Sequence, residues 1–147
     1  MTTTINHFDN VIDVRDLIEH FEAMDDERTM FADAVSEADD DASRDAARVA
    51  LANWQEANGE RHKAIKSLLH DLACTGGDHQ WRGDWYPITL IRESYFENYA
   101  RELADDIGAI KDDAAWPYTC IDWWQAAREL KMDYTTTEFN GVTYFYQ

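Results

Sequence analysis

Apolar residues recur at steps of three and four along the first part of the chain. This row consists of Val14, Leu17, Ile18, Phe21, Met24, Phe31 and Val35. Such spacing forms one apolar stripe of an amphipathic helix. Asp13 is placed to cap the start of this helix, and Asp16 lies in its first turn, where a carboxylate opposes the helix dipole. The pattern allows the helix to break around residues 25–27 or to continue toward Ala38.

An acidic segment separates this helix from a second one. Asp39, Asp40, Asp41 and Ser43 are residue types typical of a turn and a helix N-cap. The apolar row that follows consists of Ala46, Val49, Ala50, Leu51, Trp54, Ala57, Ile65, Leu68, Leu69 and Leu72. Gly59 makes a break in this second helix possible, and Gly76 and Gly77 end the helical region.

The second half of the chain mixes strand and helix signals. Residues 74–86 indicate a loop, and the β-branched run 88–91 indicates a short strand or an extended entry to a helix. Helices are predicted at residues 95–107, with Ser94 as a cap and Gly108 as a stop, and at residues 123–132 after Asp122. Asn140-Gly141 lies between the β-rich runs 135–139 and 142–146, which predicts a β-hairpin.

These signals predict an α+β fold with a mainly helical acidic N-terminal half (1–75) and a compact C-terminal half with helices and a terminal β-hairpin (76–147). Hydrophobic residues make up 45% of the 147 positions, which is enough to bury a core. No run approaches the length of a membrane helix, and the N-terminus lacks the pattern of a signal peptide. The expected location is therefore the cytoplasm, where Cys74 and Cys120 stay reduced.

Negative charge changes this picture most. Thirty acidic residues face thirteen basic ones, which gives a net charge of −17. The segment from Asp9 to Asp45 contains fourteen acids and three arginines, so it carries −11 of that charge. Charge of this density favours a basic partner and disfavours direct contact with DNA or RNA.

Candidate chemistry is sparse by comparison. No glycine-rich nucleotide loop is present, and His62, His70, Cys74 and His79 do not have the spacing of a familiar zinc site. The run 39–41 lacks the alternation of an EF-hand calcium loop. We therefore predict no catalytic residues, no metal and no cofactor. Cys120 is interpreted as a buried structural thiol and most aromatic side chains as core, with Trp81 or Trp85 exposed in a loop.

Two runs in the C-terminal half carry a family resemblance. Residues 118–134 read YTCIDWWQAARELKMDY, and residues 139–144 read FNGVTY. An Ile-Asp-aromatic step, an Ala-Arg-acid-Leu helix and an Asp-Tyr turn before a final strand are similar to the tails of ArdA-type antirestriction proteins of phages and plasmids. Residues 99–103 (YAREL) resemble the preceding segment, so the resemblance covers about residues 88–147.

The resemblance implies an acidic DNA mimic, usually dimeric, that inhibits type I restriction enzymes. The N-terminal half does not match the family's N-terminal domains, which leaves the target open to another defence nuclease, including a CRISPR effector. The predicted partner is thus a DNA-binding defence protein, without direct nucleic-acid or membrane binding, and a homodimer is compatible with this role.

The charge pattern suggests how such mimicry would work. Helix carboxylates at steps of three and four lie about 5–6 Å apart, whereas duplex DNA carries one charge about every 1.7 Å of its axis. Two neighbouring acidic ridges could therefore approximate a phosphate track. The predicted contact residues are Asp16, Glu19, Glu22, Asp25, Asp26, Glu27, Asp33, Glu37, Asp39, Asp40, Asp41, Glu97, Asp105, Asp106, Asp112 and Asp113.

Three other interpretations stay open from the sequence. The acids could form only a solvated surface that keeps the protein soluble. They could belong to a protein-interaction module that docks a basic partner without mimicking DNA, with Trp81 and Trp85 as its anchor. The third is a small enzyme with an unrecognised carboxylate pair, for which no residue pattern gives support.

Overall fold

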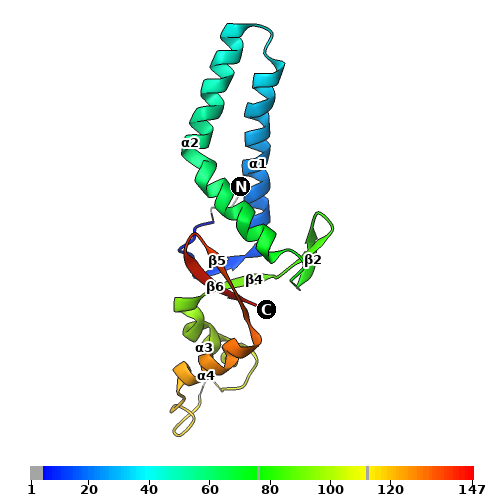
Figure 1. Ribbon diagram of the computed structural model, residues 1–147. Helices are drawn as coiled ribbons and strands as arrows, with labels where there is room; N and C mark the ends of the chain where they lie inside the picture. The colour runs from blue at the N-terminus through cyan, green and yellow to red at the C-terminus, as the bar shows by residue number, and fades with distance from the viewer. Residues whose placement is uncertain (1–4, 76, 112) are drawn as a thin grey trace.

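Two long helices form a hairpin that leads into a four-stranded sheet, and two shorter helices cover the sheet's other face (Figure 1). The computed structural model describes residues 5–75, 77–111 and 113–147. The chain folds as α+β, as the sequence predicts. Asp112, one of the predicted contact residues, lies outside the described residues.

The hairpin consists of α1 (Val14–Glu37) and α2 (Asp41–Leu72). Asp13 caps α1 by accepting from the backbone N–H of Arg15, and Asp40 caps α2 by accepting from that of Ser43. Neither helix breaks: α1 continues through residues 25–27, and α2 passes Gly59. The two helices pack against each other because their apolar stripes face one another.

The sheet is antiparallel with the order β1-β4-β6-β5. Its strands are β1 (Val11–Asp13), β4 (Thr89–Arg92), β5 (Thr135–Phe139) and β6 (Val142–Tyr146). The predicted hairpin β5–β6 forms around Asn140 and Gly141, whose φ angles of 53° and 82° are those of a two-residue turn. The N-terminal segment thus supplies an edge strand to a sheet built mostly from the C-terminal half.

Alternate side chains of the sheet enter two separate clusters. Leu90 and Tyr144 face the base of the helix hairpin, whereas Ile91 and Phe145 face α3 (Phe96–Asp106) and α4 (Trp123–Leu130). A sheet side-chain repeat of two explains this division. The larger cluster contains residues from both halves of the chain, so the hydrophobic core is not interrupted at the predicted boundary of residues 75 and 76.

The helix hairpin extends well beyond this core. Met24 and Trp54 are the buried residues nearest to the tip of the hairpin. The structure describes all of residues 25–53, and none of them is buried. Phe31 is the outermost side chain of α1 that packs partly against the main cluster. Figure 1 shows this distal part projecting away from the sheet.

Several sequence-based expectations were wrong. Residues 74–86 are not a plain loop: they contain the hairpin of β2 (Asp78–Trp81) and β3 (Asp84–Tyr86). Arg82 and Gly83 form its turn with φ angles of 49° and 80°. The residue pattern hid it, because the strands are short and do not alternate cleanly. Ser94 does not cap α3 but lies in a 3-10 turn, Glu93–Tyr95, that precedes it.

The two cysteines and several tryptophans also differ from expectation. Cys120 is exposed and is therefore not a buried structural thiol, and Cys74 is exposed as well. Trp116 and Trp124 are 79% and 61% exposed, so they do not belong to the core. Among the helices that the structure describes, none has the length and apolarity needed to cross a membrane.

Candidate partner-binding surfaces

Carboxylates line the face of α1 that points away from α2. We call this set the α1 acidic row, and it consists of Glu19, Glu22, Asp26, Asp33 and Glu37, all exposed. The buried positions Phe21 and Met24 fix its direction, because they turn the opposite side of the helix toward α2 and the sheet. From Glu19 to Glu37 the row extends about 27 Å at the rise of an α-helix.

The tip of the hairpin adds a second acidic group. Asp39, Asp40, Asp41 and Asp45 are exposed there. The bond from the backbone N–H of Ser43 lowers the pKa of Asp40 below its ordinary value, so this cap stays charged. Arg44 lies 3.3 Å from Asp41 and Arg48 lies 3.7 Å from Asp45, which partly neutralises this group.

Three predicted contact residues are engaged or partly shielded within the hairpin. The carboxylate of Asp25 lies 3.0 Å from Nε2 of the buried His62, and that of Glu27 accepts from Nε1 of Trp54 at 3.0 Å. Asp16 is half-buried near the sheet. Asp25 and Glu27 therefore hold α1 against α2, and the free row is narrower than the sequence suggested.

The remaining predicted acids lie at the other end of the molecule. Glu97, Asp105 and Asp106 are exposed on α3, and Asp113 is exposed in the segment after it. The sheet separates α3 from the helix hairpin (Figure 1). The fold therefore places the two groups of predicted contact acids on opposite sides of the sheet.

Basic side chains gather on one side of the hairpin and limit the acidic surface. A hollow of about 350 Å³ there is lined by Arg28, Gln55, Gly59, Glu60, His62, Lys63 and Lys66. A neighbouring hollow of about 220 Å³ shares Lys66 and adds His70 and Arg82, together with one carboxylate, that of Asp84. The hairpin is thus acidic along the outer side of α1 and at its tip, and basic along the base of α2.

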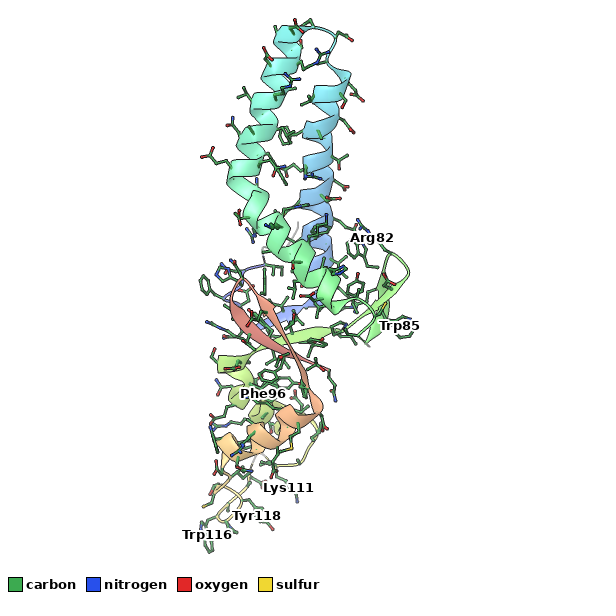
Figure 2. The ribbon with its side chains drawn as sticks, viewed as in Figure 1. Arg82, Trp85, Phe96, Lys111, Trp116 and Tyr118 are labelled. Carbon is green, nitrogen blue, oxygen red and sulfur yellow. The ribbon has the colours of Figure 1, made fainter. Side chains whose placement is uncertain are left out.

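Exposed aromatic side chains mark the end opposite the hairpin tip. Figure 2 shows Trp116 and Tyr118 projecting from the loop between α3 and α4. They are 79% and 71% exposed, and Ile107 at the start of this loop is 70% exposed. Beside them is a hollow of about 500 Å³ lined by Ala109, Ile110, Lys111, Ala114, Pro117, Tyr118 and Ile121. We call these three side chains and the hollow the aromatic end.

Sequence reasoning did not single out the aromatic end, although a signal was available. Trp116-Pro117 comes after Gly108, which was predicted to end a helix, and lies in a segment without helical or strand periodicity. Trp116 is therefore not part of an apolar stripe that a helix or strand would bury. The pair that was singled out behaves differently. Trp85 is 51% exposed, whereas Trp81 is half-buried, packs edge-on against Phe21 and lies under Arg82 at 4.1 Å.

Two further features of the described residues bear on metal binding and on thiol chemistry. No three His, Cys, Asp or Glu side chains among them are close enough together to hold a metal ion. The carboxylate of Asp84 lies 3.6 Å from Sγ of Cys74, and its negative charge raises the pKa of that thiol. A raised pKa keeps the thiol protonated at neutral pH and makes it a poor nucleophile.

Comparison with known proteins adds no relative. No family model, no curated protein and no solved structure matches this chain.

Proposed function

We propose that this protein inhibits a DNA-binding defence enzyme, such as a restriction enzyme or a CRISPR effector, by placing its acidic hairpin in the basic cleft that binds DNA. The α1 acidic row is the observation that carries this proposal. It is exposed over its whole length and is held on a helix that the base of the hairpin fixes to the sheet.

The fixed register of these charges favours a DNA-binding cleft over a nonspecific basic surface. Five carboxylates over about 27 Å give one charge about every 7 Å, compared with one about every 3.4 Å along a DNA strand. The row is sparser than a strand, but its charges keep a fixed register. A flexible acidic tail would have to lose conformational entropy to reach such a register, and the helix does not.

Net charge and resemblance support the same function. A charge of −17 attracts a basic cleft over long distances and speeds association at low ionic strength. The segments that resemble ArdA-type antirestriction proteins form α3, α4 and strands β4 to β6. The strands pack against the base of the hairpin, and the two helices cover the other face of the sheet. In this arrangement the C-terminal half is the scaffold and the N-terminal half supplies the contact surface.

The test is a reversal of the row with a charge-matched control. Glu19, Glu22 and Asp33 are changed to lysine in one variant, and Glu56, Asp71 and Glu138, which are exposed elsewhere, in the other. Inhibition is measured as loss of DNA binding by purified type I restriction enzymes and CRISPR effector complexes. We expect the row variant to lose at least tenfold in inhibition and the control to stay within about threefold. Equal inhibition by both variants would contradict the proposal.

The aromatic end supports a second candidate, a module that docks a basic protein without mimicking DNA. Trp116 and Tyr118 offer large rigid side chains of the kind that dominates binding energy at interfaces. In that case Trp116→Ala abolishes partner capture, whereas raising the salt concentration from 50 to about 500 mM changes it little, because the contact is apolar. For the DNA mimic the opposite is expected in both tests: Trp116→Ala should leave inhibition unchanged, and the same rise in salt concentration should weaken it.

A further inference from the structure

Two neighbouring hollows near the base of the helix hairpin combine cations with an aromatic wall. We call the hollow of about 350 Å³ the basic hollow, because its lining includes Arg28, Lys63 and Lys66. We call the hollow of about 220 Å³ the aromatic hollow, because its lining includes Phe21, Trp81 and Tyr86. Lys66 lines both, so the two hollows adjoin. Figure 2 shows Arg82, which also lines the aromatic hollow, beside the base of the helix hairpin.

Cations outnumber carboxylates around these hollows, although thirty acids face thirteen lysines and arginines in the whole chain. The two linings together contain two carboxylates, Glu60 and Asp84, and the four cations Arg28, Lys63, Lys66 and Arg82. None of these four cations makes an ion pair within the part of the chain that the structure describes. Lys63 and Lys66 are neighbours on the surface of α2, where like charges repel, so an anion between them would stabilise both.

Gly59 gives the basic hollow a further polar group. It lies inside α2, where glycine lowers helix stability relative to alanine. Neither a positive φ nor a close backbone contact requires glycine there: the heavy atoms nearest to a Cβ atom at this position belong to the side chain of Gln55, with Oε1 at 3.0 Å. The absence of that Cβ atom leaves room for the amide of Gln55, which lines the basic hollow and can donate to an anion.

The aromatic hollow supplies a flat wall. Trp81 packs edge-on against Phe21, and its ring centroid lies 6.0 Å from that of Tyr86. The guanidinium group of Arg82 lies over Trp81, 4.1 Å from the ring centroid. Aromatic rings and planar guanidinium groups are surfaces on which nucleobases stack. A ligand that spans both hollows therefore needs an anionic group at one end and a flat ring at the other.

We propose that the two hollows bind a nucleoside monophosphate, with its phosphate in the basic hollow and its base against Trp81 and Arg82. A phosphate accepts charge-assisted hydrogen bonds from several cations at once, which suits Arg28, Lys63 and Lys66. An aromatic wall with a few polar groups is typical of sites for small ligands.

A single nucleotide fits this surface better than a nucleic-acid strand. Its charge stays beside the four cations, whereas the further phosphates of a strand would extend over a protein surface of net charge −17 and be repelled. The proposal does not rest on the proposed function, because the α1 acidic row takes no part in it.

Calorimetric titration of the full-length chain at about 50 mM salt tests the site. The probes are AMP, GMP, CMP and UMP, with inorganic phosphate and single-stranded decathymidylate for comparison. We expect at least one of the four nucleotides to bind at one site with a dissociation constant below about 1 mM. Inorganic phosphate should bind more weakly because it lacks the base, and the decathymidylate should bind more weakly because its other phosphates are repelled.

Three sets of substitutions locate the binding. Lys63→Gln with Lys66→Gln should weaken nucleotide binding at least tenfold, since each lysine gives a charge-assisted hydrogen bond. Arg82→Asn suits the positive φ at that turn, and should weaken the binding of nucleotides but not that of phosphate. Gly59→Ala should raise the melting temperature and weaken nucleotide binding. The control is Arg44→Gln with Arg48→Gln, which removes the same charge near the tip of α2 and should leave binding unchanged.

Circular dichroism shows whether each variant is folded. Any of the following results overturns the proposal: none of the four nucleotides binds at millimolar concentration, the folded lysine variant binds as tightly as the unaltered chain, or the control loses as much affinity as the lysine variant. Phosphate that binds as tightly as the nucleotides would show that the base makes no contact, and a decathymidylate that binds more tightly would point to a strand. Each of these results also overturns the proposal, as does a Gly59→Ala variant that gains stability without losing affinity.

Discussion

At the scale of single residues, a few buried polar contacts decide which acids are free. His62 is 8% exposed, stacks on Phe21 with ring centroids 5.0 Å apart and meets the carboxylate of Asp25. Trp54 is 5% exposed and donates from its ring N–H to the carboxylate of Glu27. The sequence placed Asp25 and Glu27 among the contact residues because helical spacing alone does not reveal which carboxylates meet a polar group on another helix.

Trp54 separates packing from hydrogen bonding in this cluster. Trp54→Phe keeps most of the apolar contact but removes the donor to Glu27, so we expect a loss of about 1 kcal/mol in the free energy of unfolding. Trp54→Ala leaves a cavity and should cost about 3–5 kcal/mol. Urea unfolding followed by circular dichroism measures both. If the two substitutions destabilise equally, the hairpin is not held by the packing of this ring.

Tyr144 gives the fold a dependence on alkaline pH. Its side chain is fully buried, and its hydroxyl group donates within the N-terminal segment, at 2.6 Å from the carbonyl oxygen of Asp9. Burial raises the pKa of Tyr144 to about 12. An unfolded tyrosine ionises near pH 10, so between pH 10 and 12 the unfolded state has lost a proton that the folded state keeps.

The free energy of unfolding should therefore fall as the pH rises through this window, by up to about 2 kcal/mol. Tyr134, whose pKa burial also raises, contributes with the same sign. Denaturant titrations at pH 8, 10 and 11 measure the slope. Tyr144→Phe should be less stable at pH 8 but show a flatter decline, and a decline as steep as that of the unaltered chain would assign the effect to other groups.

At the scale of elements, the sequence predicted helix starts and turns correctly where a single residue type determines the local backbone conformation. The aspartates at positions 13, 40 and 122 cap helices as their residue type indicates, and Asn140-Gly141 forms the predicted turn. The β2–β3 hairpin escaped prediction because its stability comes from contacts with α1 and the end of α2, where Trp81 and Tyr86 pack. Such contacts are not local and leave no periodic signal.

Gly77 illustrates a contact of this kind. Its φ is +72°, and a Cβ atom there would lie 2.0 Å from the carbonyl oxygen of Tyr86. Gly83, in the turn of the same hairpin, has a φ of +80° but open space around it. The positive φ favours glycine at both positions. Only at Gly77 does a second chain segment, the backbone of Tyr86, also approach closely.

Comparing the stability of Gly77→Ala with that of Gly83→Ala measures the energetic effect of this close approach. We expect Gly83→Ala to cost about 1 kcal/mol for its backbone conformation, and Gly77→Ala to cost about 2–3 kcal/mol more because the β3 backbone must move. Thermal unfolding gives both values. Equal losses would mean that Gly77 and β3 lie farther apart than the structure places them.

At the scale of the whole molecule, the sheet divides the protein into two ends with different surfaces. The acidic hairpin projects from one face and the aromatic end from the other, as Figure 2 shows. Composition and periodicity predict the two kinds of element but not this arrangement, because it depends on β1 joining the sheet beside β4. The same pairing explains why acids on α1 and α3 that look alike in the sequence lie at different ends of the molecule.

The distal hairpin is the part whose removal separates function from folding. Residues 25–53 contribute no buried side chain, and only the partly buried Phe31 among them packs against the main cluster, so nearly all of the core lies in residues 5–24 and from Trp54 onward. We expect a chain in which a four-residue glycine-rich turn replaces residues 29–51 to keep the sheet. Its melting temperature should stay within about 5 °C of that of the full chain, since little apolar area is lost. The far-ultraviolet circular dichroism should fall in proportion to the helix removed.

The shortened chain retains Glu19, Glu22 and Asp26 but lacks Asp33, Glu37 and the tip. If the defence enzyme binds the full length of the α1 acidic row, inhibition should drop at least tenfold, because the remaining carboxylates extend over only about 10 Å. A shortened chain that folds and inhibits fully would instead place the contact at the aromatic end, where Trp116→Ala would then abolish it. A shortened chain that fails to fold would show that the distal helices contribute to stability despite their exposure.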